Sequence, residues 1–148
     1  MKISPKGRYA LVSMIYMAKN YDSGKHITVI KISEKFSISK IYLEQIFSLL
    51  KKGNLVTSIK GAQGGYQLSR SPKTITVYDI LYAIENVLFD TSEDTVLETA
   101  PAFEKTIRNL IFDKLDNKIF EFFSSITLHE LLTDTQNNLE DFSSMYYI

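Results

Sequence analysis

The segment from residue 28 to residue 69 constrains the fold most. Within it, a helical pattern is followed by two strand-like runs that a glycine-rich turn joins. Thr28 can cap a short helix, and "SIS" (37–39) is a turn into a second helix. Two β-prone runs, "LVTSIK" and "YQLS", then flank "GAQGG", which is typical of a hairpin. This order predicts a helix-turn-helix followed directly by a β-hairpin, within a mainly α-helical fold. The short helix is expected to bury Val29, Ile32 and Phe36.

The second of these helices has the clearest boundaries. Ser39 is a natural N-cap, Ile38 and Leu43 can form a hydrophobic staple, and Gly53 is expected to be left-handed after the last turn. Its inner stripe consists of Leu43, Ile46, Phe47 and Leu50. By subtraction, the outward face consists of Lys40, Ile41, Glu44, Gln45, Ser48 and Lys51. A face that mixes cations with hydrogen-bonding groups in this way can read base edges.

Three of the six glycines of the chain lie in the hairpin turn, at Gly61, Gly64 and Gly65. A phosphate-binding loop would lead from a strand into a helix, and the sequence matches neither of the common nucleotide-binding glycine patterns. Two interpretations remain: a plain hairpin turn, or a wing that contacts a nucleic-acid backbone. The position directly after a helix-turn-helix favours the wing.

Further helices are predicted on both sides of this unit. Ser4 and Pro5 begin a first helix that extends to about Asn20. Thr76 and Asp79 form a capping-box pattern at the start of a fourth helix, whose apolar face consists of Ile80, Leu81, Ile84 and Val87. Residues 90–100 form an acidic connector, which fits a solvated loop better than a metal site.

The last third of the chain reads as a long helix from residue 101 to residue 124, followed by a short helix and a tail at 125–148. Thr127 with Glu130 marks the start of the short helix, "TLHELLTD". The long helix is too apolar to remain exposed, so it is expected to form a homodimer interface; the alternative is that it packs on its own domain. Its interface residues are predicted to be Phe103, Ile107, Leu110, Ile111, Leu115, Ile119 and Phe122.

Composition narrows the function classes. The absence of cysteine excludes disulfides, thiolate metal sites and cysteine nucleophiles. No run of 18 apolar residues and no signal-peptide pattern occur, which predicts a cytoplasmic protein. Residues 1–73 carry 13 Lys and Arg against three Asp and Glu (net +10), and residues 74–148 carry four against 14 (net −10). A polyanionic partner for the basic half is favoured over two faces that are merely solvated.

Several motifs together closely resemble the Rrf2 family of bacterial winged-helix transcription regulators. They are "MKISPKGRYAL", "YLEQIFSLLKKGNLVTSIKGAQGGYQLSRSP", "ITVYDILYAIE" and "ITLHELL". The match is strong over residues 1–89, clear at 126–132 and weak between them. It implies a winged helix-turn-helix DNA-binding domain at 1–89 and a dimerisation helix at 101–124. Third helices would enter successive major grooves, and wings would contact the flanking minor grooves.

The resemblance also implies roles for residues. Glu44 takes the position of the family's base-reading glutamate, and Lys60 that of an arginine which enters the minor groove in many members. Lysine lacks the planar fork of arginine, so it is less suited to reading a narrow minor groove. The predicted DNA-binding residues are Lys6, Arg8, Ser39, Lys40, Ile41, Tyr42, Glu44, Gln45, Ser48, Lys51, Lys60, Ala62, Gln63, Gly64 and Gly65.

The family resemblance bears on cofactors and partners as well. Many members sense iron, nitric oxide or redox state through a cluster held by three connector cysteines, which this chain lacks. His26 and His129 are expected to be structural or exposed. Among cysteine-free members, the chain is most similar to the repressor of cysteine metabolism of low-GC Gram-positive bacteria. That similarity implies cysteine synthase (O-acetylserine thiol-lyase) as a partner, bound through Tyr146, Tyr147 and Ile148; the alternative is a frayed tail.

The sequence therefore predicts a dimeric DNA-binding repressor without metal or catalysis. An enzyme is the less favoured class, because no nucleophile–base pair or carboxylate pair stands out. A winged-helix adaptor that docks proteins without DNA is the stronger alternative, and the basic first half argues against it.

Overall fold

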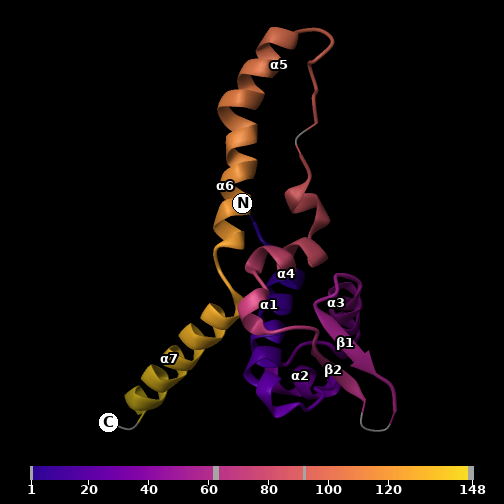
Figure 1. The fold of residues 1–148 in the computed structure, drawn as a ribbon, viewed down its shortest axis with the longest axis vertical. Helices are drawn as coiled ribbons and strands as arrows, with labels where there is room; N and C mark the ends of the chain where they lie inside the picture. Colours follow the sequence, from indigo (N-terminus) through magenta and orange to yellow (C-terminus); the bar gives the residue numbers. More distant parts are fainter. Residues whose placement is uncertain (1, 62–63, 92, 147–148) are drawn as a thin grey trace.

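A computed structural model describes residues 2–61, 64–91 and 93–146 of the chain. Its elements form a winged-helix unit (residues 4–84), from which a long helical arm (residues 101–124) projects (Figure 1). The α-helices are α1 (Pro5–Lys19), α2 (Val29–Phe36), α3 (Lys40–Lys52), α4 (Val77–Ile84), α5 (Pro101–Ile107), α6 (Asp113–Ser124) and α7 (Leu128–Tyr146). The strands are β1 (Val56–Ile59) and β2 (Gly65–Leu68), and short 3-10 turns cover Tyr21–Ser23, Pro72–Thr74 and Asn86–Phe89.

The predicted helix starts are confirmed by their capping hydrogen bonds. The hydroxyl of Ser4 accepts from the amide of Gly7 at 3.1 Å, and the Ser39 hydroxyl accepts from Tyr42 at 3.5 Å. The capping box of Thr76 with Asp79 is complete, since each side chain accepts a hydrogen bond from the backbone of the other residue. These contacts satisfy N–H groups that the first turn leaves without helical partners.

The core lies between α1, α2, α3, α4 and the hairpin. The predicted inner stripe of α3 is confirmed, because Leu43, Ile46, Phe47 and Leu50 have no exposed surface. Burying an aromatic and three aliphatic side chains there stabilises the unit by roughly 1.5–3 kcal/mol for each side chain. This core fixes α3 with its opposite face toward solvent.

The hairpin is antiparallel, with Val56 opposite Leu68 and Ile59 opposite Gly65. Ile27, in the loop before α2, extends it by exchanging two 2.8 Å backbone hydrogen bonds with Tyr66. A Cβ at Gly64 would stand 2.4 Å from the carbonyl oxygen of Ile59, and one at Gly65 (φ +153°) would stand 2.7 Å from that of Ile27. The glycines therefore serve the tight turn and the close approach of a third backbone segment.

The arm runs from its far end back to the winged-helix unit, beside the connector (Figure 1). At its base the ring of Phe120 on α6 meets that of Tyr78 on α4 edge-on, 4.8 Å between centroids. Helix α7 then packs its first turns on α1, with Leu128 fully buried, and continues away from the unit in another direction (Figure 1). The turn between α6 and α7 is held by a hydrogen bond from the amide of Val77 to the carbonyl of Ile126 at 2.9 Å.

Two predicted details of the winged-helix unit are wrong. The left-handed residue after α3 is Asn54 (φ 59°), whereas Gly53 has φ −79°. Gly53 instead allows α4 to approach, since a Cβ there would lie 3.0 Å from the Cβ of Ala83. Val87 lies beyond α4 in a 3-10 turn and is 83% exposed, because α4 already ends at residue 84.

The C-terminal third also differs from the prediction. The long helix spans 101–124 as expected, but residues 108–112 adopt a π-helical turn. The final helix is not short: it runs for 19 residues to Tyr146. Neither glycine nor proline interrupts the sequence after Asp134, so the helix continues past the predicted end.

Candidate nucleic-acid interface

The outward face of α3 is open to solvent, as predicted. Its exposed side chains are Lys40, Ile41, Glu44, Gln45, Ser48 and Lys51. With Lys6 on α1, most of these residues line a shallow depression of about 520 Å³. Ile41 is 70% exposed, so the polar face of α3 also presents one apolar side chain to solvent. Hydrogen-bond donors, acceptors and an apolar contact on one exposed helix face are what base edges in a major groove require.

Ion pairs and aromatic contacts order this face. The ammonium group of Lys40 lies 3.8 Å from the carboxylate of Glu44 one turn later, and both side chains are about half exposed. The ring of Tyr42 packs edge-on against that of Tyr9 at 5.7 Å, and the ammonium of Lys6 lies 5.8 Å from the Tyr42 ring centre. Tyr42 is half-buried, so it connects the start of α1 to α3 as well as bordering the face.

The hairpin lies beside α3, and the short turn at residues 53–55 joins them (Figure 1). Lys60 follows β1 and is exposed, as is Arg8 on the first turn of α1. Gly64 and Gly65 are half-buried at the start of β2. The predicted contacts of Ala62 and Gln63 lie outside the described residues. Exposed cations are therefore present on α1, on α3 and after β1, all in the basic half of the chain.

The loop before α2 adds two residues that the sequence analysis missed. Lys25 and Thr28 are exposed and lie beside Gly64 of the hairpin turn, together with His26. They come to this position because Ile27 pairs with Tyr66. No sequence pattern signals that pairing, since residues 27 and 66 are far apart in the chain and the bridge is isolated.

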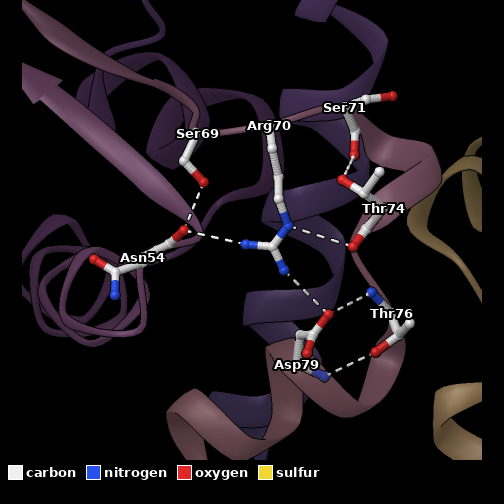
Figure 2. A network of polar contacts seen from close by, with 7 residues as sticks. All are labelled: Asn54, Ser69, Arg70, Ser71, Thr74, Thr76 and Asp79. Carbon is white, nitrogen blue, oxygen red and sulfur yellow. Dashed lines mark hydrogen bonds and ion pairs between the residues drawn. The ribbon is translucent and has the colours of Figure 1, made fainter.

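Arg70 holds the hairpin to both neighbouring helices (Figure 2). Its guanidinium donates to the carbonyl of Asn54 at 3.4 Å, to the carbonyl of Thr74 at 3.3 Å and to the carboxylate of Asp79 at 3.3 Å. The hydroxyl of Ser69 donates to the same Asn54 carbonyl at 2.6 Å. One planar side chain therefore ties together the end of α3, the end of β2 and the capping box of α4.

The arm presents an apolar surface that its own chain leaves uncovered. Phe103 is 75% exposed and Leu110 63%; Ile107, Ile111, Leu115 and Phe122 are also exposed, and Ile119 is half-buried. The connector is clamped to the π-helical turn, because Arg108 donates to Asp94 at 2.8 Å and also pairs with Asp113. At the base, burial raises the pKa of the Tyr78 phenol, with contributions from Tyr82 and Asp79.

The predicted partner-binding tail is only partly described. Tyr146 is the last residue of α7, and Tyr147 and Ile148 lie outside the described residues. The apolar residues Leu139, Phe142 and Met145 on the second half of α7 are exposed. The region before the tail is therefore a helix with uncovered apolar side chains rather than an extended segment.

Potential metal donors do not converge in the described part of the chain. The chain has no cysteine. His26 is half-buried before α2, and its Nε2 lacks a hydrogen-bond partner among the described residues. His129 is exposed on α7. Within residues 2–61, 64–91 and 93–146, no three His, Asp or Glu side chains could hold one ion. No helix in these ranges is both long and apolar enough to span a bilayer.

Solved structures with the same architecture include known regulators. The chain is similar to CymR (YrzC), the global cysteine regulator of B. subtilis, with 34% identity and a TM-score of 0.72 over 90% of this chain and 97% of that one. It is also similar to IscR of T. potens, with 34% identity and a TM-score of 0.68 over 91% and 88% of the two chains. Both similarities extend over the winged helix and the arm.

Sequence comparison agrees with these structures. The chain is 32% identical to the HTH-type transcriptional regulator IscR of Photorhabdus laumondii, over 92% of this chain and 82% of that protein. Residues 3–134 match the Rrf2 family, described as iron-dependent transcriptional regulators. The donor set of this chain does not fit a protein-bound iron, because the chain has no cysteine and, among the described residues, no three His, Asp or Glu side chains come together. The relatives are DNA-binding regulators and not enzymes, and this chain belongs to the Rrf2 family of transcriptional regulators.

Proposed function

We propose that the protein is a homodimeric repressor that acts on cytoplasmic DNA without a metal cofactor. The observation that carries this proposal is the exposed face of α3, where a carboxylate, an amide, a hydroxyl and cations stand on a helix fixed by a buried inner stripe. All six side chains on that face are exposed, and Lys40 and Glu44 pair with each other within α3. A repressor would bind over a promoter and exclude polymerase.

In this proposal α3 enters the major groove and the hairpin contacts the adjacent backbone. Glu44 is an acceptor, so its base partner is the exocyclic amino group of a cytosine. Lys40 would then turn from Glu44 toward a phosphate, since the exposed pair between them is weak. Lys60 and Arg8 are exposed cations and Lys6 is a half-buried one; all three would position the protein without reading sequence.

Dimerisation by the arm would place two such surfaces at a fixed separation. At 1.5 Å per residue, a helix of this length spans about 36 Å. Its exposed apolar residues lie along most of that length. A dimer with two-fold symmetry would recognise an operator with two related half-sites.

The test is DNA binding by Glu44→Ala, Lys60→Ala and the control Glu34→Ala, measured by fluorescence anisotropy on operator variants in a salt series. Glu34→Ala removes the same charge from an exposed site on α2. We expect Glu44→Ala to lose about 1–3 kcal/mol of discrimination at one base pair per half-site. Lys60→Ala should weaken all sequences and reduce the salt slope. The assigned roles are wrong if both variants lose affinity uniformly and keep the same preferred bases.

We further propose that the regulated genes serve cysteine metabolism and that cysteine synthase is a partner. The similarity to the global cysteine regulator of B. subtilis over nearly the whole chain supports this target. In the proposed complex, the carboxylate of Ile148 enters the amino-acid carboxylate site of the enzyme, and Tyr146 and Tyr147 add contact area. Helix α7 would carry this peptide away from the DNA-binding unit (Figure 1).

Calorimetric titration of purified cysteine synthase tests this partner. Full-length protein should give a saturable heat, and deletion of Ile148 should abolish it while leaving the dimer and DNA affinity unchanged. O-acetylserine should compete, because it needs the same carboxylate site, and the coupling must be reciprocal in binding free energy. Equal heat from both forms, or none from either, would remove the tail as the determinant.

A further inference from the structure

A second candidate site lies on the side of the winged-helix unit where α7 meets α1 and α2. It is a groove of about 380 Å³, a volume within the range of small-molecule sites. Its walls are mostly apolar and come from three helices: Val12, Ile15 and Tyr16 of α1, Phe36 of α2, and Leu132 and Leu139 of α7. The rings of Tyr16 and Phe36 pack edge-on at 5.7 Å, so the aromatic part of the wall is ordered by its own contacts.

The charged residues that line this groove are both cationic. Lys19 of α1 and Lys35 of α2 both line it, and its lining residues include no Asp or Glu. The ammonium group of Lys35 lies 5.6 Å from the ring centre of Tyr16 and 5.8 Å from that of Phe36. Neither lysine belongs to an ion pair within the described ranges. Two cations without acidic partners beside an apolar wall complement a ligand with one anionic end.

We propose that this groove, here called the α1–α2–α7 groove, binds an amphiphilic monocarboxylate, with its hydrocarbon part against the apolar wall and its carboxylate between Lys19 and Lys35. The polar lining residues fit the same orientation. The hydroxyl of Thr135 is already donated to the carbonyl of Leu131 at 2.7 Å. The other donors among the lining residues are the phenol of Tyr16, the amide of Gln136 and the two ammonium groups. A cationic or uncharged amphiphile would find no matching charge there.

The position of the groove couples it to DNA binding, a step that depends on the proposed function. Helix α2 connects to α3 through the turn at residues 37–39, where the Ser33 hydroxyl donates to the Ile38 carbonyl at 2.6 Å. Helix α7 connects directly to the arm through residues 125–127. A ligand that contacts α1, α2 and α7 at once therefore favours one position of α3 relative to the arm over other positions. If DNA binds one of these positions better, the ligand changes DNA affinity by the ratio of its own affinities for the two positions.

The experiment uses the intact dimer and decanoate as the probe, below the concentration at which it aggregates. Decanoate is titrated by calorimetry, and decylamine, which has the same chain with a cationic end, is titrated in parallel. We expect one decanoate per chain and no saturable binding of decylamine. Combined Lys19→Ala and Lys35→Ala should weaken decanoate binding by about tenfold or more, since charged hydrogen bonds are lost.

Matched variants separate the groove from the rest of the surface. Leu139→Asp should abolish decanoate binding, whereas Phe142→Asp, on the same helix but outside the groove, should leave it unchanged. Lys105→Ala on α5 controls for the loss of a cation. The proposed site is overturned by any of three results: no saturable binding of decanoate, equal binding of decylamine, or decanoate binding that Leu139→Asp does not change. If a second copy of the chain fills the groove in the dimer, decanoate will not bind, and the proposal is overturned as well.

DNA affinity with and without decanoate provides the second readout. A measurable shift that disappears in Leu139→Asp supports the coupling, and an unchanged affinity at saturating decanoate overturns it. DNA binding without the probe is measured in the same series. Its absence would reject the proposed function, whereas intact DNA binding without decanoate binding would reject only this inference.

Discussion

The winged-helix unit and the arm differ in how many of their apolar side chains are buried within a single chain. In the unit, Met14, Ile32 and Phe47 have no exposed surface and lie in one contiguous core. Among residues 101–124, all of which the structure describes, Glu104 is the only buried residue, and it is a charged one that accepts a hydrogen bond from the amide of Val96. The unit therefore buries its core within one chain, whereas the arm leaves its apolar side chains exposed, as the proposed dimer requires.

Charge divides the molecule along almost the same line. The first 73 residues have a net charge of +10 and the remaining residues −10. The basic part contains α1, α2, α3 and the hairpin, and the acidic part contains the arm and α7. Within the acidic part, the arm carries four basic and four acidic residues, so the excess of ten negative charges lies in residues 74–100 and 125–148. Phosphates repel these segments, which favours an orientation on DNA in which residues 1–73 face the phosphates. The two regions thus differ in burial and in charge, which is consistent with the separate DNA and dimer contacts proposed for them.

The largest effect is expected from placing charge on the arm. Ile111 and Leu115 are about half exposed, so Ile111→Asp with Leu115→Asp should leave each chain folded. In a dimer, an unpaired buried carboxylate costs roughly 3–5 kcal/mol, which raises the dimer dissociation constant by about a thousandfold or more. Sedimentation velocity should then show monomers, with the helical circular dichroism signal kept.

The control for this variant adds the same charges at polar positions of the same helix. Asn109→Asp with Asn117→Asp changes two exposed residues and should remain dimeric. If the Ile111→Asp, Leu115→Asp protein stays dimeric, the interface lies elsewhere, and the exposed apolar face of the arm does not distinguish it from the winged-helix unit in the proposed way.

The second prediction compares two phenylalanines, one from each region. Phe47→Ala removes a ring with no exposed surface and should lower the free energy of unfolding by about 3–5 kcal/mol. Phe103→Ala removes a ring that is 75% exposed and should change it by less than about 0.5 kcal/mol. Both changes are made in the monomeric Ile111→Asp, Leu115→Asp variant, so that urea titration measures the free energy of unfolding of one chain without a contribution from dimer dissociation. A similar loss at both positions would show that the arm has a core of its own.

Capping residues explain why much of the fold could be predicted from sequence. Ser4, Ser39, Thr76 and Thr127 are short-range signals, and each forms its expected hydrogen bond with a residue three positions later. The outward face of α3 followed by subtraction from its apolar stripe, and all six of its predicted residues are exposed. These successes share one cause: the deciding interactions are local in sequence.

The misses have the opposite cause. Asn54 takes the left-handed position because Gly53 is needed where α4 approaches, and no local pattern reports that approach. The pairing of Ile27 with Tyr66 likewise depends on distant segments, so Lys25 and Thr28 were missed as neighbours of the hairpin turn. The length of α7 was a different error, since its apolar spacing continues through Leu139, Phe142 and Met145 and was available in the sequence.

The third prediction tests how rigidly the hairpin is fixed to α3. Arg70→Ala removes three hydrogen bonds from a partly exposed site, and each is worth about 1 kcal/mol at most there. We expect a loss of roughly 1–2 kcal/mol in unfolding and a weaker, less sequence-selective DNA complex. Lys73→Ala removes one exposed cation outside the network and controls for charge. Equal DNA affinity of the two variants would show that Arg70 acts only as a charge.

The smallest effect is expected at the joint between the two regions, where Glu130 closes the capping box of α7. Its carboxylate accepts from the amide of Thr127 at 2.7 Å and from the Thr127 hydroxyl at 3.0 Å. These hydrogen bonds hold the pKa of Glu130 below its ordinary value of 4.5. The folded state thus binds this proton less readily than the unfolded state, so the stabilisation is fully present above pH 4.5 and is lost as the pH falls through the lowered pKa.

Glu130→Gln keeps an oxygen acceptor but cannot ionise, so it isolates that contribution. Urea unfolding at fixed protein concentration should show the natural protein to be slightly more stable than Glu130→Gln at neutral pH. The difference should shrink as the pH falls below 4.5. Glu140→Gln makes the same change at an exposed position later on α7 and serves as the control for the loss of a carboxylate. A difference between the natural protein and Glu130→Gln that stays constant down to low pH would mean that the carboxylate charge does not stabilise this joint. In that case the packing of Leu128 on the winged-helix unit would be what holds α7 in place.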